Sequence, residues 1–249
     1  MLNEQTHQKL VAMKLHAMAA SFQEYMEQVD EEKLSFEERL GLMVDREWNE
    51  RQQRRISRRL QLAKLREQAC VEDIDFRSPR NLDRSVVQRL STCQWIHRHE
   101  NLILTGPTGI GKTWIGCALA NKACRESFSA LYTRLPRLLH NLRIAHADGS
   151  YLKTLARLAK TDVLFLDDWG LVSLSEVGRQ DLLEVLEDRY GRRSTIVASQ
   201  LPVDTWHEHL GEATIADSIL DRLVHNAHRL ALRGPTRRKN RKPKEKEEK

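Results

Sequence analysis

The segment NLILTGPTGIGKT, residues 101–113, places a short apolar run, a glycine-rich turn and the start of a helix in direct succession. It satisfies the pattern G-x-x-x-x-G-K-[ST] with a strand before it and a helix after it, which is the context that a phosphate-binding loop requires. Gly106, Gly109 and Gly111 allow the backbone to bend tightly and to turn its N–H groups inward around phosphate groups. The segment therefore predicts a nucleoside triphosphate site.

The two residues after the last glycine supply the charge and the metal ligand that such a site needs. Lys112 is expected to bind the outer phosphates, and the hydroxyl of Thr113 is the expected ligand of Mg²⁺. The helix that begins here adds the positive end of its dipole. The predicted nucleotide-binding residues are Gly106, Pro107, Thr108, Gly109, Ile110, Gly111, Lys112, Thr113 and Trp114.

Apolar, strand-like runs alternate with helical stretches around this loop. The alternation predicts an α/β fold, a parallel sheet with helices on both faces. The expected strands are 101–105, 129–133, 163–167, 194–199 and 228–232. The expected helices are 86–95, 112–128, 135–145, 151–160, 177–190 and 215–227.

Two aspartates follow the buried run VLFLDD, residues 163–168. Asp167, at the end of a predicted strand, is the expected carboxylate on the Mg²⁺ side, and Asp168 is the candidate that orients or deprotonates the attacking water. The alternative is that both only cap the strand or a turn, which a phosphate-binding loop upstream disfavours. An aspartate at the second position is shorter than the glutamate often found there, which points to slow hydrolysis.

The run STIVASQLP ends another strand with Ser199 and Gln200. A polar side chain at this place can contact the outer phosphate or the attacking water, and Gln200 is the candidate for that sensing role. Ordinary turn chemistry before Pro202 is the alternative, and the residues alone leave both open.

Arg222 stands near the C-terminal end of the predicted α/β domain. An arginine that completes the site of a neighbouring subunit stabilises charge on the transferring phosphoryl group. The simpler alternative is an ion pair with Asp217 or Asp221 on its own helix. On the residues alone, the ion pair is the favoured interpretation.

The N-terminal part predicts helices, one over residues 5–29 and another that begins at Ser35, since Ser35 and Glu38 form a capping-box pattern. Residues 51–66 then carry seven basic and no acidic residues. Without acidic partners in that range, the basic face is expected to contact the DNA phosphate backbone rather than to be only solvated. The predicted DNA-binding residues, which share one helical face, are Arg51, Arg54, Arg55, Arg58 and Arg59.

Composition limits the other possibilities. The 249 residues include 41 basic and 35 acidic ones, and residues 233–249 hold 9 of the basic and 3 of the acidic residues, so the rest of the chain is balanced. A mean hydropathy of −0.58 and the lack of a long apolar run argue against a membrane protein. The four cysteines form no metal-binding pattern. We expect a cytoplasmic protein with reduced thiols.

Five blocks of the sequence together resemble the IstB-type helper ATPases of bacterial insertion sequences, members of the AAA+ superfamily related to the DnaC helicase loaders and to DnaA. The blocks are LSFEERLGLMVDREWNERQQRRISRRLQLAKLR, NLILTGPTGIGKTWIGCALA, VLFLDDWG, TIVASQLPVDTWH and IADSILDRLVHNAHRLAL. The resemblance implies subunits that bind ATP and Mg²⁺ and assemble head to tail on duplex DNA. They would deform the DNA, present it to a partner transposase and be reset by hydrolysis. It also implies a bacterial, nucleoid-associated location.

The resemblance also assigns roles to single residues. It implies that Lys112 binds phosphate, that Thr113 and Asp167 hold the metal, and that Asp168 is the catalytic acid. Gln200 would be sensor I, and Arg222 would be an arginine finger acting in trans, which reverses the ion-pair interpretation. One departure is that no helical lid is expected after Leu232, so a second sensing arginine is in doubt, although Arg237 or Arg238 could reach the site.

The expected organisation is a helical DNA-binding and oligomerisation domain over 1–70, a linker and helix over 71–100, an ATPase core over 101–232 and a basic, disordered tail over 233–249. Two other functions remain open. A replicative helicase loader would use its N-terminal helices to hold a protein instead of DNA. A small-molecule kinase with the same loop would need an acceptor pocket and would act as a monomer.

Overall fold

The computed structural model describes residues 2–27 and 34–236 of the chain. Contacts divide the chain after Arg58 into two compact units. The division falls inside one helix, α3 (Phe36–Ala63). The sequence predicted a helical domain up to residue 70, but residues 59–70 pack with the second unit, because Ala63 and Ala69 are fully buried in its hydrophobic core. Among the described helices, none is long and apolar enough to cross a membrane.

The first unit contains α1 (Leu2–Ala12), α2 (His16–Glu27) and most of α3. The prediction of a single helix over 5–29 is wrong, because the backbone turns at Lys14, where φ is 60°. The N–H of Lys14 bonds to the carbonyl of Val11 and that of Leu15 to the carbonyl of Leu10, both at 2.9 Å. This is the hydrogen-bond pattern of a Schellman motif, with a lysine where glycine is usual.

The start of α3 confirms the predicted capping box. The N–H of Ser35 donates to Glu38 Oε2 at 2.7 Å, and the N–H of Glu38 donates to Ser35 Oγ at 3.2 Å. Further along α3, the buried carboxylate of Glu47 accepts the backbone N–H groups of Ala17 and Met18, at 2.8 and 3.1 Å. Glu47 thereby satisfies donors that the first turn of α2 leaves without partners inside the helix.

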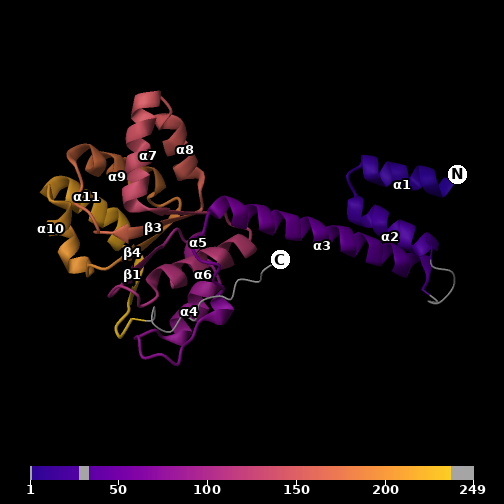
Figure 1. Ribbon diagram of the computed structural model, residues 1–249, viewed down its shortest axis with the longest axis horizontal. Helices are drawn as coiled ribbons and strands as arrows, with labels where there is room; N and C mark the ends of the chain where they lie inside the picture. The colour runs from indigo at the N-terminus through magenta and orange to yellow at the C-terminus, as the bar shows by residue number, and fades with distance from the viewer. Residues whose placement is uncertain (1, 28–33, 237–249) are drawn as a thin grey trace, which may run out of the picture. The chain divides into compact units, whose positions relative to one another are not determined.

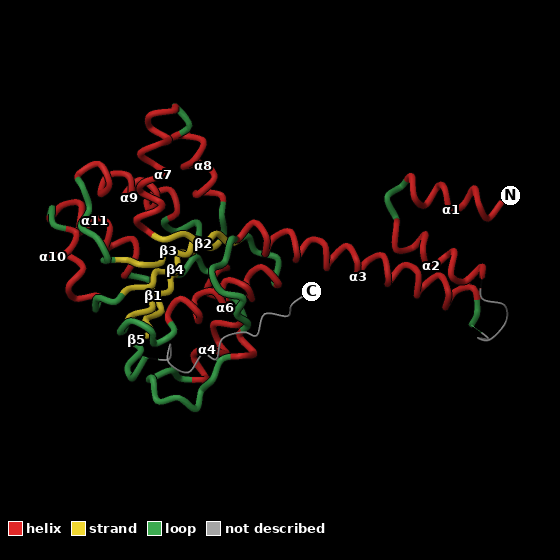
Figure 2. The backbone as a smooth tube through the Cα atoms, in the orientation of Figure 1, coloured by secondary structure: helices red, strands yellow, loops and turns green. Residues whose placement is uncertain are grey.

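The second unit is built on a parallel sheet of five strands in the order β2-β3-β4-β1-β5 (Figure 2). The β1 strand lies between β4 and β5, so that Leu102 is opposite Ile196 on one side and His228 on the other. The bounds are β1 Asn101–Thr105, β2 Ala130–Arg134, β3 Val163–Trp169, β4 Ser194–Ser199 and β5 Ala227–Ala231.

Both faces of the sheet are buried, as the near-continuous apolar runs of the strands predict. Leu104 and Phe165 belong to the core under one face, and Ile103 and Leu166 belong to the core under the other. The helices of the two faces lie on opposite sides of the strands (Figure 1). One face carries α4 (Arg84–Ser91), α5 (Gln94–His97) and α6 (Lys112–Arg125). The other carries α7 (Leu135–Asp148), α8 (Tyr151–Lys160), α9 (Glu176–Arg189), α10 (Trp206–Leu210) and α11 (Ala213–Val224).

The α/β fold class and the five strands are confirmed, and β1 and β4 have the predicted bounds. The helix predicted over 86–95 is two helices, because Cys93 between them has φ of 59°. The short α10 was not predicted, and neither were the 3₁₀ turns η1 (Val71–Asp73) and η2 (Val203–Thr205).

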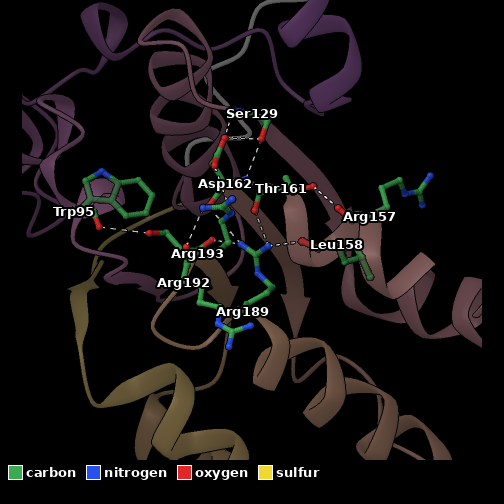
Figure 3. Close-up of polar contacts among 10 residues, drawn as sticks. Trp95, Ser129, Arg157, Leu158, Thr161, Asp162, Arg189, Arg192 and Arg193 are labelled. Carbon is green, nitrogen blue, oxygen red and sulfur yellow. Dashed lines mark hydrogen bonds and ion pairs between the residues drawn. The ribbon is translucent and has the colours of Figure 1, made fainter. Parts of the chain in front are cut away.

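A buried arginine on α9 joins the starts of β3 and β4 to the end of α8. Arg189, at the end of α9, is 1% exposed. Its guanidinium donates to the carbonyl oxygens of Leu158 and Thr161 (Figure 3). It also donates to the carbonyl of Ser194 and the hydroxyl of Thr195. These acceptors come from the end of α8, the turn before β3 and the start of β4. Because a buried carbonyl without a partner costs free energy, Arg189 stabilises three elements at once.

Replacing Arg189 with Met should lower the free energy of unfolding by about 3–5 kcal/mol, because several buried carbonyls lose their donor together. The matched control is Arg192→Met, three residues away on the exposed surface, which should change stability by less than about 0.5 kcal/mol. Urea unfolding measures both. Equal stability of the two variants would contradict a supporting role for Arg189.

Candidate nucleotide site

The glycine-rich loop lies between the end of β1 and the start of α6. Gly106, Gly109 and Gly111 have φ values of 139°, 82° and 107°, a range that favours glycine. A Cβ atom on Gly106 would overlap the carbonyl group of Leu232, the residue after β5. Glycine is therefore required at 106 both by the backbone angle and by the close approach of a neighbouring strand.

The side chain of Lys112 stays inside this loop. Its Nζ atom donates to the carbonyl oxygens of Gly106 at 2.6 Å and Pro107 at 3.0 Å. The residue is 8% exposed, so the ammonium group is held where the loop encloses phosphate. The side chain of Ile110 is buried in the hydrophobic core at 1% exposure and anchors the loop, so the predicted nucleotide contact of this residue would be made by its backbone.

Three hydrogen bonds converge on the carboxylate of Asp167, which is 2% exposed at the end of β3. The hydroxyls of Thr113 and Tyr132 both donate to Oδ2 at 2.9 Å, and the N–H of Asp168 donates to Oδ1 at 3.0 Å. Thr113 and Asp167 thus lie together although they are far apart in the sequence. Their hydroxyl and carboxylate oxygens are the hard donors that Mg²⁺ prefers.

The second aspartate reaches the same site through a local irregularity of β3. The pairing of β3 with β4 shifts register between Leu166 and Trp169, and Asp168 has φ of 59°. Neighbouring side chains of a regular strand point to opposite faces, but this bulge brings both carboxylates to the cavity. Asp168 also forms an ion pair with Arg134 at the end of β2.

Gln200 lies directly after β4, the strand that pairs with β1. The hydroxyl of Thr108 in the glycine-rich loop donates to Gln200 Oε1 at 2.6 Å. The side chain is therefore in contact with the loop that would hold the phosphates. The contact is compatible with both interpretations, so the sensing role of Gln200 stays a prediction.

These groups line one cavity of about 710 Å³. It brings together the predicted residues Thr108, Gly109, Gly111, Lys112, Thr113, Trp114, Asp167, Asp168 and Gln200. In the described part of the chain, no three His, Cys, Asp or Glu side chains form a metal cluster. The carboxylates of Asp167 and Asp168 in this cavity fit Mg²⁺, which proteins bind through one or two carboxylates with waters and substrate phosphates.

The sequence did not reveal Arg66 and Arg80, which also line the cavity. Arg80 is 2% exposed, its Nη2 donates to the carbonyl of Asp75 at 2.8 Å, and its guanidinium lies beside Gly111. Both arginines come from the segment between α3 and α4, which carries no motif. Only the tertiary packing of that segment against α6 places them here.

Arg222 lies far from the cavity of its own subunit. Asn101, the first residue of β1, donates its side-chain amide to the carbonyls of Arg222 and Leu223 at 2.9 and 3.2 Å. Because the glycine-rich loop follows the other end of β1, about 16 Å of strand separates the two places. Arg222 pairs with Glu187 on α9. The ion pair with Asp217 or Asp221 on its own helix, which the residues alone favoured, is not formed among the described residues.

The structure divides the row of arginines into three groups. Arg51 pairs with Glu47 at 2.7 Å and Arg54 with Glu50 at 3.0 Å, so the premise that acidic partners are missing is wrong for these two. Their partners stand one turn earlier, outside the range that the sequence analysis considered. Arg55 and Arg58 are exposed, and among the described residues neither has an ion pair. Arg59 is half-buried and lies in the second compact unit.

The described part of the tail ends at Thr236. The candidate second sensors, Arg237 and Arg238, and the rest of the basic tail lie outside the described residues.

Gly106→Ala should lower the free energy of unfolding by about 3 kcal/mol and strongly reduce nucleotide affinity, since the new methyl group displaces the loop. Gly149→Ala is the matched control, because Gly149 also has positive φ, 74°, but open space around its Cβ position. That control should cost only about 1 kcal/mol and leave affinity unchanged. Urea unfolding and titration with a fluorescent ATP analogue test both, and equal behaviour would refute the steric argument.

The chain matches the family model of the IstB-like ATP binding protein over residues 8–245. It is 52% identical to a protein of Sinorhizobium fredii named as an insertion sequence ATP-binding protein, over 98% of this chain and 100% of that one. A protein of Pseudomonas aeruginosa named as an ATP-binding protein of insertion sequence IS21 is 32% identical over 92% of this chain and 86% of its own length.

Solved structures share the fold of the second unit. DnaI has a TM-score of 0.57 at 24% identity and covers 67% of this chain and 92% of its own. The DnaC helicase loader has a TM-score of 0.54 at 18% identity, covering 66% of this chain and 97% of its own. At these identities the similarity shows the fold alone. Because the family match extends over nearly the whole sequence and the first relative aligns over its full length, the chain belongs to the IstB-like ATP binding proteins, the ATPases of insertion sequences.

Proposed function

We propose that this ATPase regulates transposition by assembling head to tail on duplex DNA, deforming the DNA and recruiting a transposase, with ATP hydrolysis resetting the assembly. The observation that carries the proposal is the position of Arg222. It is at the opposite end of β1 from the nucleotide cavity of its own subunit. An arginine placed there serves catalysis only in the site of a second copy.

Within one subunit, the cavity supplies the groups for binding ATP and for the attack of water. The loop N–H groups and Lys112 would hold the phosphates, and Thr113 with Asp167 would hold Mg²⁺. A metal ion held there would neutralise charge on the phosphates. Asp168 would orient and deprotonate the water, and Gln200 would contact it or the outer phosphate.

Assembly would change the partner of Arg222. In the single subunit its guanidinium is held by Glu187 and by the carbonyl of Ser218, the latter at 2.9 Å. In a head-to-tail pair, the phosphates of the neighbour would take the place of Glu187. The ion pair is partly exposed, so the exchange costs little, and the gain on the transferring phosphoryl group is large. Hydrolysis would then depend on the presence of a neighbour.

The DNA contact is assigned to α3. Arg55 and Arg58 are exposed one turn apart and have guanidinium groups that no acidic side chain of the described residues neutralises. Contacts of this kind read the phosphate backbone and carry no sequence information. Target choice would therefore be loose and would favour DNA that bends easily.

The partner transposase is inferred from the relatives, whose names place them in insertion sequences. The same names argue against a small-molecule kinase and against a replicative helicase loader. Sedimentation of the protein with duplex DNA and a non-hydrolysable ATP analogue tests the proposal as a whole. Large assemblies that need both ligands are expected, whereas a persistent monomer would contradict it.

Arg55→Gln combined with Arg58→Gln should weaken duplex DNA binding by about tenfold at 0.1 M salt and reduce the slope of log K against log salt by about 2. Arg51→Gln combined with Arg54→Gln is the matched control, and it should have a smaller effect because Glu47 and Glu50 already neutralise these charges. Fluorescence anisotropy over a salt series measures both pairs. An equal loss of DNA affinity in the two variants would contradict a special role for Arg55 and Arg58.

A mixing experiment tests whether Arg222 acts in trans. Arg222→Ala and Asp168→Asn should each lower the ATPase rate at least about 100-fold. Mixed in equal amounts, they should recover about a quarter of the wild-type rate, because random head-to-tail contacts join an intact site to an intact arginine at that frequency. A mixture as inactive as its components would exclude catalysis in trans.

A further inference from the structure

The segment that follows α3 is attached to the wall of the nucleotide cavity. The helix ends at Ala63, the backbone turns at Lys64, where φ is 51°, and Leu65 packs against the core under α6. Burial raises the pKa of the Cys117 thiol on α6 to about 11, and the nearby backbone N–H groups of Glu67 and Arg66 act against this shift. Residues 64–67 are therefore held in place by the same helix that begins at the glycine-rich loop.

From this segment a chain of polar contacts leads to the metal side of the cavity. The guanidinium of Arg66 lies near the phenol of Tyr132 on β2, and this contact raises the pKa of Arg66. The hydroxyl of Tyr132 donates to Asp167 Oδ2 at 2.9 Å, and Thr113 donates to the same oxygen at the same distance. A guanidinium only donates and a carboxylate only accepts, so the hydroxyl between them has a single possible direction.

The geometry of Asp167 shows what these contacts do. With two donors on Oδ2 and the N–H of Asp168 on Oδ1, the carboxylate is held against rotation. The ring of Tyr132 is itself held edge-on against Phe165, with centroids 5.2 Å apart. The orientation of the metal-side carboxylate therefore depends on Tyr132 and, through it, on Arg66.

We propose that Tyr132 and Arg66 are positioning residues of the Mg²⁺ site, which hold Asp167 in the orientation that Thr113 and the metal require. Because Arg66 is carried by the segment after α3, the site is complete only when that segment is docked on α6. The proposal rests on ATP binding with Mg²⁺ and is independent of DNA binding and of assembly.

The test is the affinity for a fluorescent ATP analogue, measured on the full chain in Mg²⁺ and in EDTA. Tyr132→Phe keeps the ring and removes the hydroxyl, so it should weaken binding in Mg²⁺ by about 3–10-fold, the equivalent of one hydrogen bond. Binding in EDTA should change by less than about twofold. Arg66→Gln should show the same split with a smaller size, because Arg66 is exposed and its charge is screened. Arg66→Lys, which keeps a charged donor, should restore part of the loss.

Two matched controls remove equivalent groups elsewhere. Tyr151→Phe deletes a hydroxyl that donates to a buried carboxylate, Asp181, at 3.0 Å, outside the cavity. Arg125→Gln deletes a guanidinium that pairs with Glu72 on the surface. Neither control should alter the ratio of the affinities in Mg²⁺ and EDTA.

The proposal is overturned if Tyr132→Phe leaves both affinities unchanged, or if it weakens them equally, since equal losses indicate general damage to the loop. Urea unfolding identifies a variant that does not fold, and Arg66→Gln then decides the question alone. A protein that fails to bind DNA or to assemble, yet shows the Mg²⁺-dependent split, would contradict the proposed function and leave this inference intact.

Discussion

The bulge at the end of β3 is the constraint on which the chemistry of the cavity depends. A regular strand would turn one of the two aspartates away from the nucleotide, whereas the left-handed backbone at Asp168 brings both to the same side. This backbone also explains the residue type. A φ of 59° is tolerated by aspartate and asparagine far better than by longer side chains. The short second carboxylate is thus tied to the geometry that exposes it.

Around the bulge, each part of the site comes from the carboxyl end of a different strand. The loop follows β1, Tyr132 is on β2, the aspartates end β3 and Gln200 follows β4. In a parallel sheet these ends meet at one edge, which is where ligands of such folds bind. At the amino ends of the strands, the buried guanidinium of Arg189 bonds to the starts of β3 and β4 and to the end of α8. The amino ends of the strands are therefore stabilised by Arg189, and the carboxyl ends carry the residues of the site.

The sequence predicted the parts of the molecule that follow short, regular rules. The bounds of β1 and β4, the capping box at Ser35 and the convergence of Thr113 with Asp167 all follow from periodicity, capping and motif spacing. The failures have equally local causes. The break at Lys14 places a lysine in a position typical of glycine, and the partners of Arg51 and Arg54 stand one turn outside the range considered. Arg66 and Tyr132 belong to no motif, because only tertiary packing brings them to Asp167.

Under the proposed head-to-tail contact, the position of Arg222 has a consequence for any open assembly of subunits. A contact that uses the two ends of a subunit differently leaves one unfilled site at one terminus and one unused arginine at the other. In a chain of n subunits only n − 1 sites are complete, and a closed ring leaves none incomplete. The rate per subunit would then rise with the length of an open filament and stay constant for a ring. Turnover would thus report the length and closure of the assembly.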